Sequence, residues 1–237
     1  IRRSDAVTAV SEHLREETYR LLCCEGDSPD IQVIYNFVDT ERYVPRPCPE
    51  TRGHFAREGE KIVLHVSNFR PVKRAPDVVQ VFAELSREVP ARLLLVGEGP
   101  ELPKAEALAD SLGVGDRVRS LGQSGDIERL LPCADLFLLP SESESFGLAA
   151  LEAMACGVPP VASRLGGLVE VVEDGVSGLL CPVGDTGAMA RRAVGLLKDP
   201  AAHSAMAKAA RARAVERFDL QRGVLEYERA YTDLMDG

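Results

Sequence analysis

The sequence predicts an α/β protein built on a doubly wound parallel sheet, and two observations support this fold class. From residue 61 onward, short apolar runs of strand length alternate with segments of helical periodicity. The strand-like runs are apolar throughout, which is typical of strands that are covered on both faces. Strands and helices that alternate in this way form a parallel sheet with helices on both sides.

The individual elements follow in order along the chain. We expect strands at residues 61–68, 91–99, 117–122, 135–140, 159–164 and 178–183. Helices are expected at 76–88, 101–112, 127–131, 146–155, near Val169 and beyond Thr186. No repeat of roughly 20–50 residues and no low-complexity tract interrupts this pattern.

The first 60 residues are organised differently. Residues 6–22 predict a strand followed by a helix that Ser11 caps, and residues 31–36 predict a second strand. Residues 37–60 are polar, contain prolines and predict an irregular linker. Because the chain starts with Ile1 and not with Met, we expect it to begin partway through a larger protein.

Composition narrows the class of protein and of partner. The 237 residues are 45% apolar and 27% charged, as in ordinary globular proteins. A formal charge of −9 argues against nucleic acid or an anionic membrane as the main partner. No apolar run approaches the roughly 18 residues needed to span a bilayer, and no leader segment opens the chain. We therefore expect a cytoplasmic protein without membrane insertion.

The cysteines and histidines do not predict a metal site. The six cysteines form no CxxC pair, and we expect buried free thiols. They are Cys23, Cys24, Cys48, Cys133, Cys156 and Cys181. The four histidines, which are His13, His54, His65 and His203, are scattered without metal-ligand spacing.

The most informative run is SESESFGLAALEAMACGVPPV, at residues 141–161. It follows a predicted strand, at the end where such sheets bind ligands. The first N–H groups of the following helix are free and carry partial positive charge, which suits a diphosphate, and Gly147 permits close approach of its backbone. Glu144 and Glu152 would accept hydrogen bonds from hydroxyls of a sugar and a ribose on either side. This layout fits a nucleotide sugar, and the alternative is an amphipathic helix with two solvated glutamates.

A basic segment follows the first strand of the same sheet. Residues 65–76 read HVSNFRPVKRAP, which places Asn68, Arg70, Lys73 and Arg74 just beyond that strand. Lys73 would reach a phosphate as a mobile point charge, and Arg70 offers a planar fork that can grip an anion with two hydrogen bonds. The alternative is a solvated basic loop.

Glycines lie at the carboxyl ends of two further predicted strands. Gly97 and Gly99 lack the third glycine of a dinucleotide fingerprint, so we interpret them as a tight turn that shapes the crevice. The backbone around Gly122 and Gln123 would contact a base, or would form only a turn.

The glycine pair at 166–167 leaves two interpretations open. Its N–H groups would face a ligand, or it would simply turn the chain into a helix. No GxSxG, HExxH or GxxxxGK[ST] motif supports a serine hydrolase, a zinc protease or a P-loop protein.

Taken together, these segments resemble the C-terminal half of the retaining GT-B glycosyltransferases of family 4. The resemblance extends over nearly the whole chain, including VTAVSEHL, PDIQVIYNFVD, LLLVGEGPE and GGLVEVVEDGVSGLL. It implies that residues 1–25 are a remnant of an N-terminal acceptor domain and 26–60 an interdomain linker. Residues 61–216 would form a Rossmann-like nucleotide-sugar-binding domain, and 217–237 a helix that returns toward the N-terminal domain.

The resemblance also implies roles for individual residues. Glu144 would lie by the donor sugar, Glu152 would bind the ribose and Lys73 the diphosphate. Most members carry Gly-Arg where this chain has Ser67 and Asn68, so Arg70 is expected to replace the missing arginine in part. The implied catalytic residues are Lys73 and Glu144, and the implied donor-binding residues are Asn68, Arg70, Gly122, Gln123, Ser145, Phe146, Gly147, Leu148 and Glu152.

Two segments, SNFRPVKR and SESESFGLAALEAMACGVP, further resemble the branch of the family that makes N-acetylglucosaminyl malate for bacillithiol biosynthesis. This resemblance implies transfer of N-acetylglucosamine from UDP-N-acetylglucosamine to L-malate, without metal or cofactor. It is compatible with a homo-oligomer. It also implies that these 237 residues alone do not catalyse the transfer. The alternatives are another acceptor, a non-catalytic nucleotide-binding or regulatory domain, and, least supported, an NAD-dependent oxidoreductase.

Overall fold

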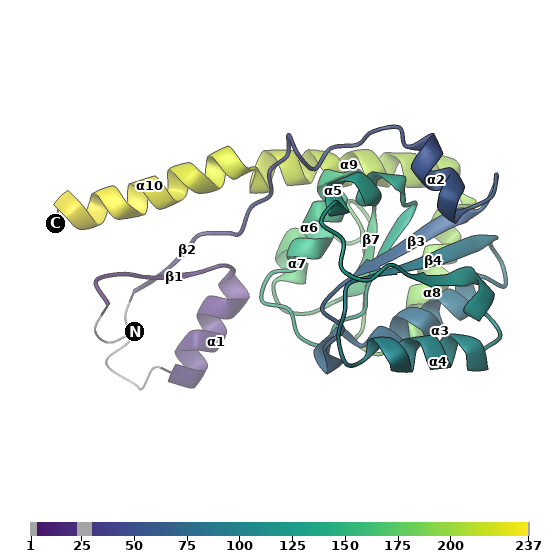
Figure 1. Cartoon of the computed structure of the whole chain (residues 1–237). Coiled ribbons are helices and arrows are strands. Elements are labelled where there is room, and N and C mark those ends of the chain that lie inside the picture. Colours follow the sequence, from purple (N-terminus) through teal and green to yellow (C-terminus); the bar gives the residue numbers. More distant parts are fainter. Residues whose placement is uncertain (1–3, 23–29, 237) are drawn as a thin grey trace.

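A computed structural model describes residues 4–22 and 30–236 and contains a six-stranded parallel sheet (Figure 1). The strand order is β5-β4-β3-β6-β7-β8, which is that of a doubly wound fold. The strands are β3 Lys61–Val66, β4 Ala91–Val96, β5 Val118–Ser120, β6 Leu136–Leu139, β7 Pro160–Ser163 and β8 Leu179–Cys181. Every strand lies inside a segment predicted from the sequence, so the predicted fold class is confirmed.

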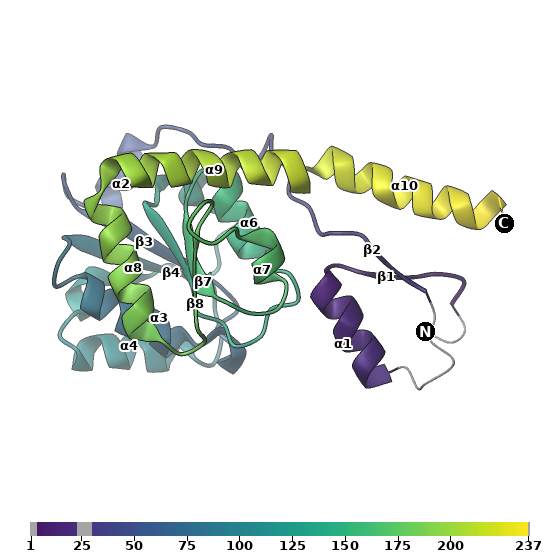
Figure 2. The ribbon, with the colours of Figure 1, turned by 180° about the vertical axis from the view of Figure 1, so that it is seen from behind.

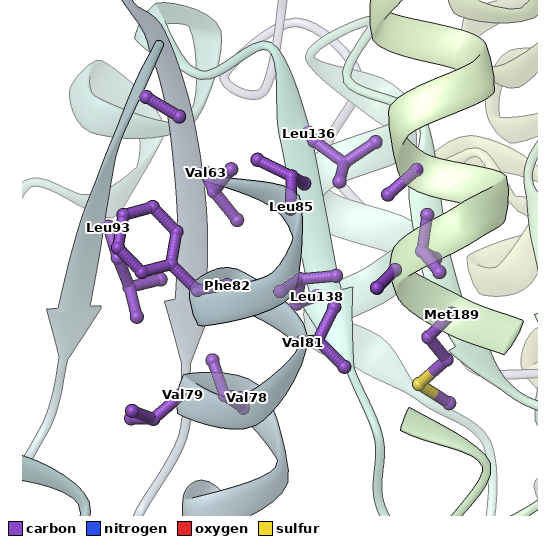
Figure 3. Close-up of a cluster of buried hydrophobic side chains, with 14 of the residues drawn as sticks. Val63, Val78, Val79, Val81, Phe82, Leu85, Leu93, Leu136, Leu138 and Met189 are labelled. Atoms are coloured by element: carbon purple, nitrogen blue, oxygen red, sulfur yellow. The ribbon is translucent and has the colours of Figure 1, made fainter. Parts of the chain in front are cut away.

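Helices cover both faces of this sheet (Figures 1 and 2). One face packs against α3 Ala75–Leu85, α4 Leu102–Ser111 and α8 Thr186–Lys198. The other packs against α5 Ile127–Leu130, α6 Leu148–Ala155, α7 Leu168–Val171 and α9 Pro200–Phe218. In β3, Val63 belongs to the first apolar cluster, whereas Ile62 and Leu64 belong to the second. Figure 3 shows residues of the first cluster, with Leu85 near Val63 and the ring of Phe82 near Leu93.

The order of the strands fixes where a ligand can bind. From β3 the chain moves outward to β4 and β5, and it then returns to β6 on the other side of β3. Ligands of doubly wound sheets bind at such a reversal, beyond the carboxyl ends of the two central strands. The segments that leave β3 and β6 are therefore brought together. The first includes a 3₁₀ turn, η1 Pro71–Lys73.

The N-terminal segment and the last helix lie apart from this sheet (Figures 1 and 2). β1 Val7–Ala9 and β2 Ile31–Val33 form a two-stranded parallel sheet beside α1 Glu12–Leu22. As predicted, Ser11 caps α1, because its Oγ accepts a hydrogen bond from the Leu14 N–H at 3.1 Å. α10 Leu220–Asp236 continues beyond α9, and its Gly223 packs against the ring of Phe37.

One prediction from the sequence was wrong in part, because residues 37–60 are not irregular throughout. They contain α2 Pro49–Phe55, which begins with a proline where a helix needs no N–H donor. Arg52 attaches this short helix to the sheet by donating to the Cys133 and Glu60 carbonyls and by pairing with Asp135 at 2.7 Å. The helix therefore depends on contacts distant in sequence, which the local pattern does not reveal.

Three of the four cysteines in the described part of the chain are buried. Cys133, Cys156 and Cys181 are buried free thiols, as predicted, whereas Cys48 is a half-buried free thiol. Cys23 and Cys24 lie outside the described residues.

Within residues 4–22 and 30–236, no helix combines the length and apolar character needed to cross a membrane. The same residues contain no cluster of three or more side chains suited to a metal ion.

His65 is fully buried in β3 and should make the protein sensitive to acid. Burial lowers the pKa of His65 from 6.5 to about 4. The neutral ring donates from Nδ1 to the Leu138 carbonyl at 2.9 Å, and Nε2 accepts from the Ser67 hydroxyl at 2.8 Å.

Between pH 6.5 and about 4, the unfolded chain takes up a proton at His65 that the folded protein excludes, so stability falls as the pH falls through this window. We expect His65→Asn to flatten the pH dependence of urea unfolding there. The exposed His54→Asn is the control. An unchanged slope for His65→Asn would contradict the prediction.

Candidate functional site

The predicted cation and carboxylate meet where β3 and β6 end. Lys73 Nζ lies 2.6 Å from Glu144 Oε1, and the Ser141 hydroxyl donates to the same oxygen at 2.8 Å. The side chains of Lys73 and Glu144 are only 22% and 10% exposed, so water screens this pair weakly. The structure thus brings together the two residues that the sequence analysis assigned to catalysis.

A cavity of about 300 Å³ opens beside this ion pair. Its lining includes six predicted site residues, namely Lys73, Glu144, Ser145, Phe146, Gly147 and Leu148. Asn36 and Ala149 complete the lining, and the sequence analysis missed both. Asn36 ends the apolar run 31–36, so its signal was a polar residue at a strand end.

The start of α6 forms one wall of the cavity. The helix begins at Leu148 and not at Phe146 as predicted, because Gly147 adopts a left-handed φ of 98°. A Cβ on this glycine would lie 2.5 Å from Leu168 Cδ2, so only glycine fits here. In the described part of the chain, the N–H groups of Ser145, Phe146, Gly147 and Leu148 have no hydrogen-bond partner. These donors can bind an anion in the cavity.

The glycine pair at 166–167 supports the loop 144–146 from behind. The Gly167 N–H donates to the Glu144 carbonyl at 3.1 Å. A Cβ on Gly166 would overlap the Glu144 carbonyl oxygen, and one on Gly167 would overlap that of Ser145. The turn into a helix is confirmed, since α7 begins at Leu168, and the Gly167 N–H is used by the Glu144 carbonyl. The contact of the Gly166 N–H with a ligand stays a prediction.

A second pair of glycines supports the segment that carries Lys73. A Cβ on Gly97 would overlap the Ser67 carbonyl oxygen, and one on Gly99 would overlap that of Asn68. The backbone held there is strained, because the buried Phe69 has a left-handed φ of 42°. The predicted tight turn at Gly97 and Gly99 is confirmed, and its role in shaping the crevice stays a prediction.

The remaining predicted contacts lie outside the cavity lining. Asn68, Arg70 and Gln123 are exposed, and the Gly122 carbonyl accepts the Gly97 N–H at 2.8 Å. Their contacts with a donor stay predictions. The neighbouring cation Arg74 is occupied, because it pairs with Asp77 at 2.7 Å and with Glu142 at 3.2 Å.

Glu152 is half-buried, on α6, and is absent from the cavity lining. Burial raises the pKa of Glu152, and a hydrogen bond from Tyr43 offsets this only in part. Burial and the nearby Glu152 in turn raise the pKa of Tyr43 to about 12. The predicted contact of Glu152 with a ribose stays a prediction.

The raised pKa of Glu152 gives a test of stability. The folded protein holds this proton more tightly than the unfolded chain, so ionisation of Glu152 costs stability as the pH rises above its usual pKa of 4.5. Glu152→Gln is therefore expected to raise the melting temperature at pH 7 and to lose this advantage near pH 4. The exposed Glu58→Gln should show neither effect. A wild-type melting temperature for Glu152→Gln at pH 7 would contradict the prediction.

Comparisons with known proteins show which family this chain is similar to. A family model described as "Glycosyl transferases group 1" matches residues 50–213. N-acetyl-alpha-D-glucosaminyl L-malate synthase of Bacillus anthracis is 46% identical over 236 residues, which cover 99% of this chain and 61% of that protein. D-inositol 3-phosphate glycosyltransferase of Mycobacterium marinum is 36% identical, covering 90% of this chain and 48% of that protein.

Among solved structures, HepE of Anabaena in complex with UDP and glucose superposes with a TM-score of 0.87 at 27% identity. The match covers 97% of this chain and 63% of HepE. The chain therefore spans between about half and just under two thirds of the length of these relatives.

Proposed function

Because the chain belongs to the group 1 glycosyltransferases, we propose that the protein containing it transfers N-acetylglucosamine from UDP-N-acetylglucosamine to L-malate with retention of configuration. The observation that carries this proposal is the Lys73–Glu144 pair, which lines one cavity together with the start of α6, whose first N–H groups have no partner in the described part of the chain. The donor and acceptor follow the printed name of the relative that is 46% identical. We propose a cytoplasmic location, in keeping with the free thiols of Cys133 and Cys156.

The donor diphosphate would take the place that Glu144 occupies beside Lys73. Lys73 and the N–H groups of Phe146, Gly147 and Leu148 then stabilise the negative charge that develops on the leaving diphosphate. Glu144, released from Lys73, accepts hydrogen bonds from hydroxyls of the sugar. These fixed charges and dipoles make catalysis mainly electrostatic, and the mechanism requires no metal.

The transfer exchanges one C–O bond for another. The malate hydroxyl attacks C1 of the sugar from the face that UDP leaves, so the bond from C1 to the malate oxygen forms while the bond to the diphosphate oxygen breaks. A phosphate oxygen takes the hydroxyl proton. A protein base is therefore not needed.

A steady-state assay of the full-length protein tests the proposal by following UDP release from UDP-N-acetylglucosamine. Release that requires L-malate, with formation of N-acetylglucosaminyl malate, supports it. Release that requires inositol 3-phosphate instead would assign the acceptor named for the M. marinum relative. Binding of UDP without turnover on either acceptor would favour a non-catalytic nucleotide-binding domain.

A further inference from the structure

Two hydrogen bonds hold carbonyls of the loop 144–146, and neither donor residue, Gly167 or Ser11, lines the cavity. The Gly167 N–H donates to the Glu144 carbonyl at 3.1 Å. The Ser11 hydroxyl donates to the next carbonyl, that of Ser145, at 2.6 Å. Ser11 is 134 residues distant in sequence and precedes α1, so a second part of the molecule reaches the cavity wall here.

The geometry of the peptide bond converts this contact into a constraint on the cavity. In a planar trans peptide, the C=O and N–H groups point in opposite directions. Because the Ser145 carbonyl points toward Ser11, which does not line the cavity, the N–H of Phe146 in the same peptide points away from Ser11. Phe146 lines the cavity, and its N–H has no partner among residues 4–22 and 30–236.

The position of Ser11 is itself fixed. Its side chain is fully buried, and its hydroxyl both donates to Ser145 and accepts from the Leu14 N–H. The Glu170 carboxylate accepts the N–H groups of Glu12 and His13, at 2.9 and 3.0 Å. A carboxylate at the start of a helix also interacts favourably with the helix dipole. Glu170 thus attaches the start of α1 to the sheet domain next to the loop.

We propose that Ser11 is a positioning residue of the donor site: its hydroxyl directs the Phe146 N–H into the cavity, where this N–H donates to the donor diphosphate. The inference rests on the proposed function for the identity of the ligand, but not for the position of the loop. If Ser11 has this role, diphosphate binding depends on the docking of the β1–α1 segment against the sheet domain.

The position of the loop can be tested on the ligand-free, full-length protein by hydrogen exchange. The Gly167 N–H reports on the loop, because its partner is the Glu144 carbonyl. We expect Ser11→Ala to speed exchange at Gly167 about tenfold. Thr18→Ala is the matched control, since Thr18 lies on the same helix and donates only to the Leu14 carbonyl, at 2.7 Å. Wild-type exchange at Gly167 in Ser11→Ala would overturn the inference.

The role in binding is tested by comparing UDP with uridine, which lacks the diphosphate. We expect Ser11→Ala to weaken UDP binding about tenfold in calorimetry, the usual size of a charge-assisted hydrogen bond, and to leave uridine binding unchanged. Glu170→Gln, which keeps the side-chain size, should give a smaller loss in the same direction. Thr18→Ala should bind both ligands like the wild type.

Equal losses of UDP and uridine affinity would indicate a merely structural role and would overturn the inference, as would wild-type UDP affinity in Ser11→Ala. If the unmodified protein binds no UDP, the proposed function is wrong, and so is the diphosphate contact of Phe146. Exchange at Gly167 then still decides whether Ser11 positions the loop. The two failures are therefore distinguishable.

Discussion

Lys73→Ala in the full-length protein is expected to lower kcat about a hundredfold, or about 3 kcal/mol in the activation barrier. The Lys73 ammonium already lies 2.6 Å from a carboxylate in a weakly hydrated site, so it is placed to stabilise the growing charge of a leaving diphosphate. The loss should appear mainly in turnover, because the charge is larger in the transition state than in the bound donor. Steady-state kinetics with varied UDP-N-acetylglucosamine measure this separation.

Lys104→Ala is the matched control, because Lys104 is a 67% exposed lysine that pairs with Glu101 away from the cavity. It should retain wild-type kinetics. Glu152→Ala should instead raise the KM for the donor, if Glu152 holds the ribose. Wild-type kcat in Lys73→Ala, with a normal melting temperature, would remove Lys73 from the mechanism.

Gly97→Ala is expected to lower the free energy of unfolding by about 3 kcal/mol or more. Its φ of 118° is unfavourable for any residue with a Cβ, and the added atom would overlap the Ser67 carbonyl oxygen. Because the atom met is backbone, the whole segment between β3 and Lys73 would have to shift. Urea unfolding followed by circular dichroism measures the loss.

Gly113→Ala separates the two causes of this loss. Gly113 also has a positive φ, of 70°, but a Cβ there would meet nothing within 4 Å. Gly113→Ala should therefore lower the free energy of unfolding only by the cost of placing a Cβ at a positive φ, about 1 kcal/mol. Equal losses for Gly97→Ala and Gly113→Ala would show that the overlap with Ser67 is relieved without cost.

The sequence predicted those parts of the molecule that depend on local pattern. Each strand is a short apolar run, so the burial of Val63 on one face and Leu64 on the other follows from the sequence directly. Once a parallel sheet is expected, residues just after neighbouring strands must share one edge, which is why the meeting of Lys73 and Glu144 was predictable.

Contacts between distant segments account for what the sequence did not predict. The α2 helix depends on Arg52, whose partner Asp135 is 83 residues away. The hydrogen bond from Ser11 to Ser145 spans 134 residues, and a capping serine gives no sign of a second partner. The neighbourhood of Glu152 was likewise missed, because Tyr43 comes from a segment that looked like linker.

The ion pair between Lys73 and Glu144 also affects which anions can bind to the ligand-free protein. Any small anion that approaches Lys73 must first separate it from Glu144, and a mostly buried carboxylate left with only the Ser141 hydroxyl as its partner is costly. Chloride, which has no hydrogen to donate, offers Glu144 nothing in return. A molecule that joins an anionic group to hydroxyls supplies both residues at once, so the pair acts as a filter that keeps the abundant simple anions of the cell from competing for the site.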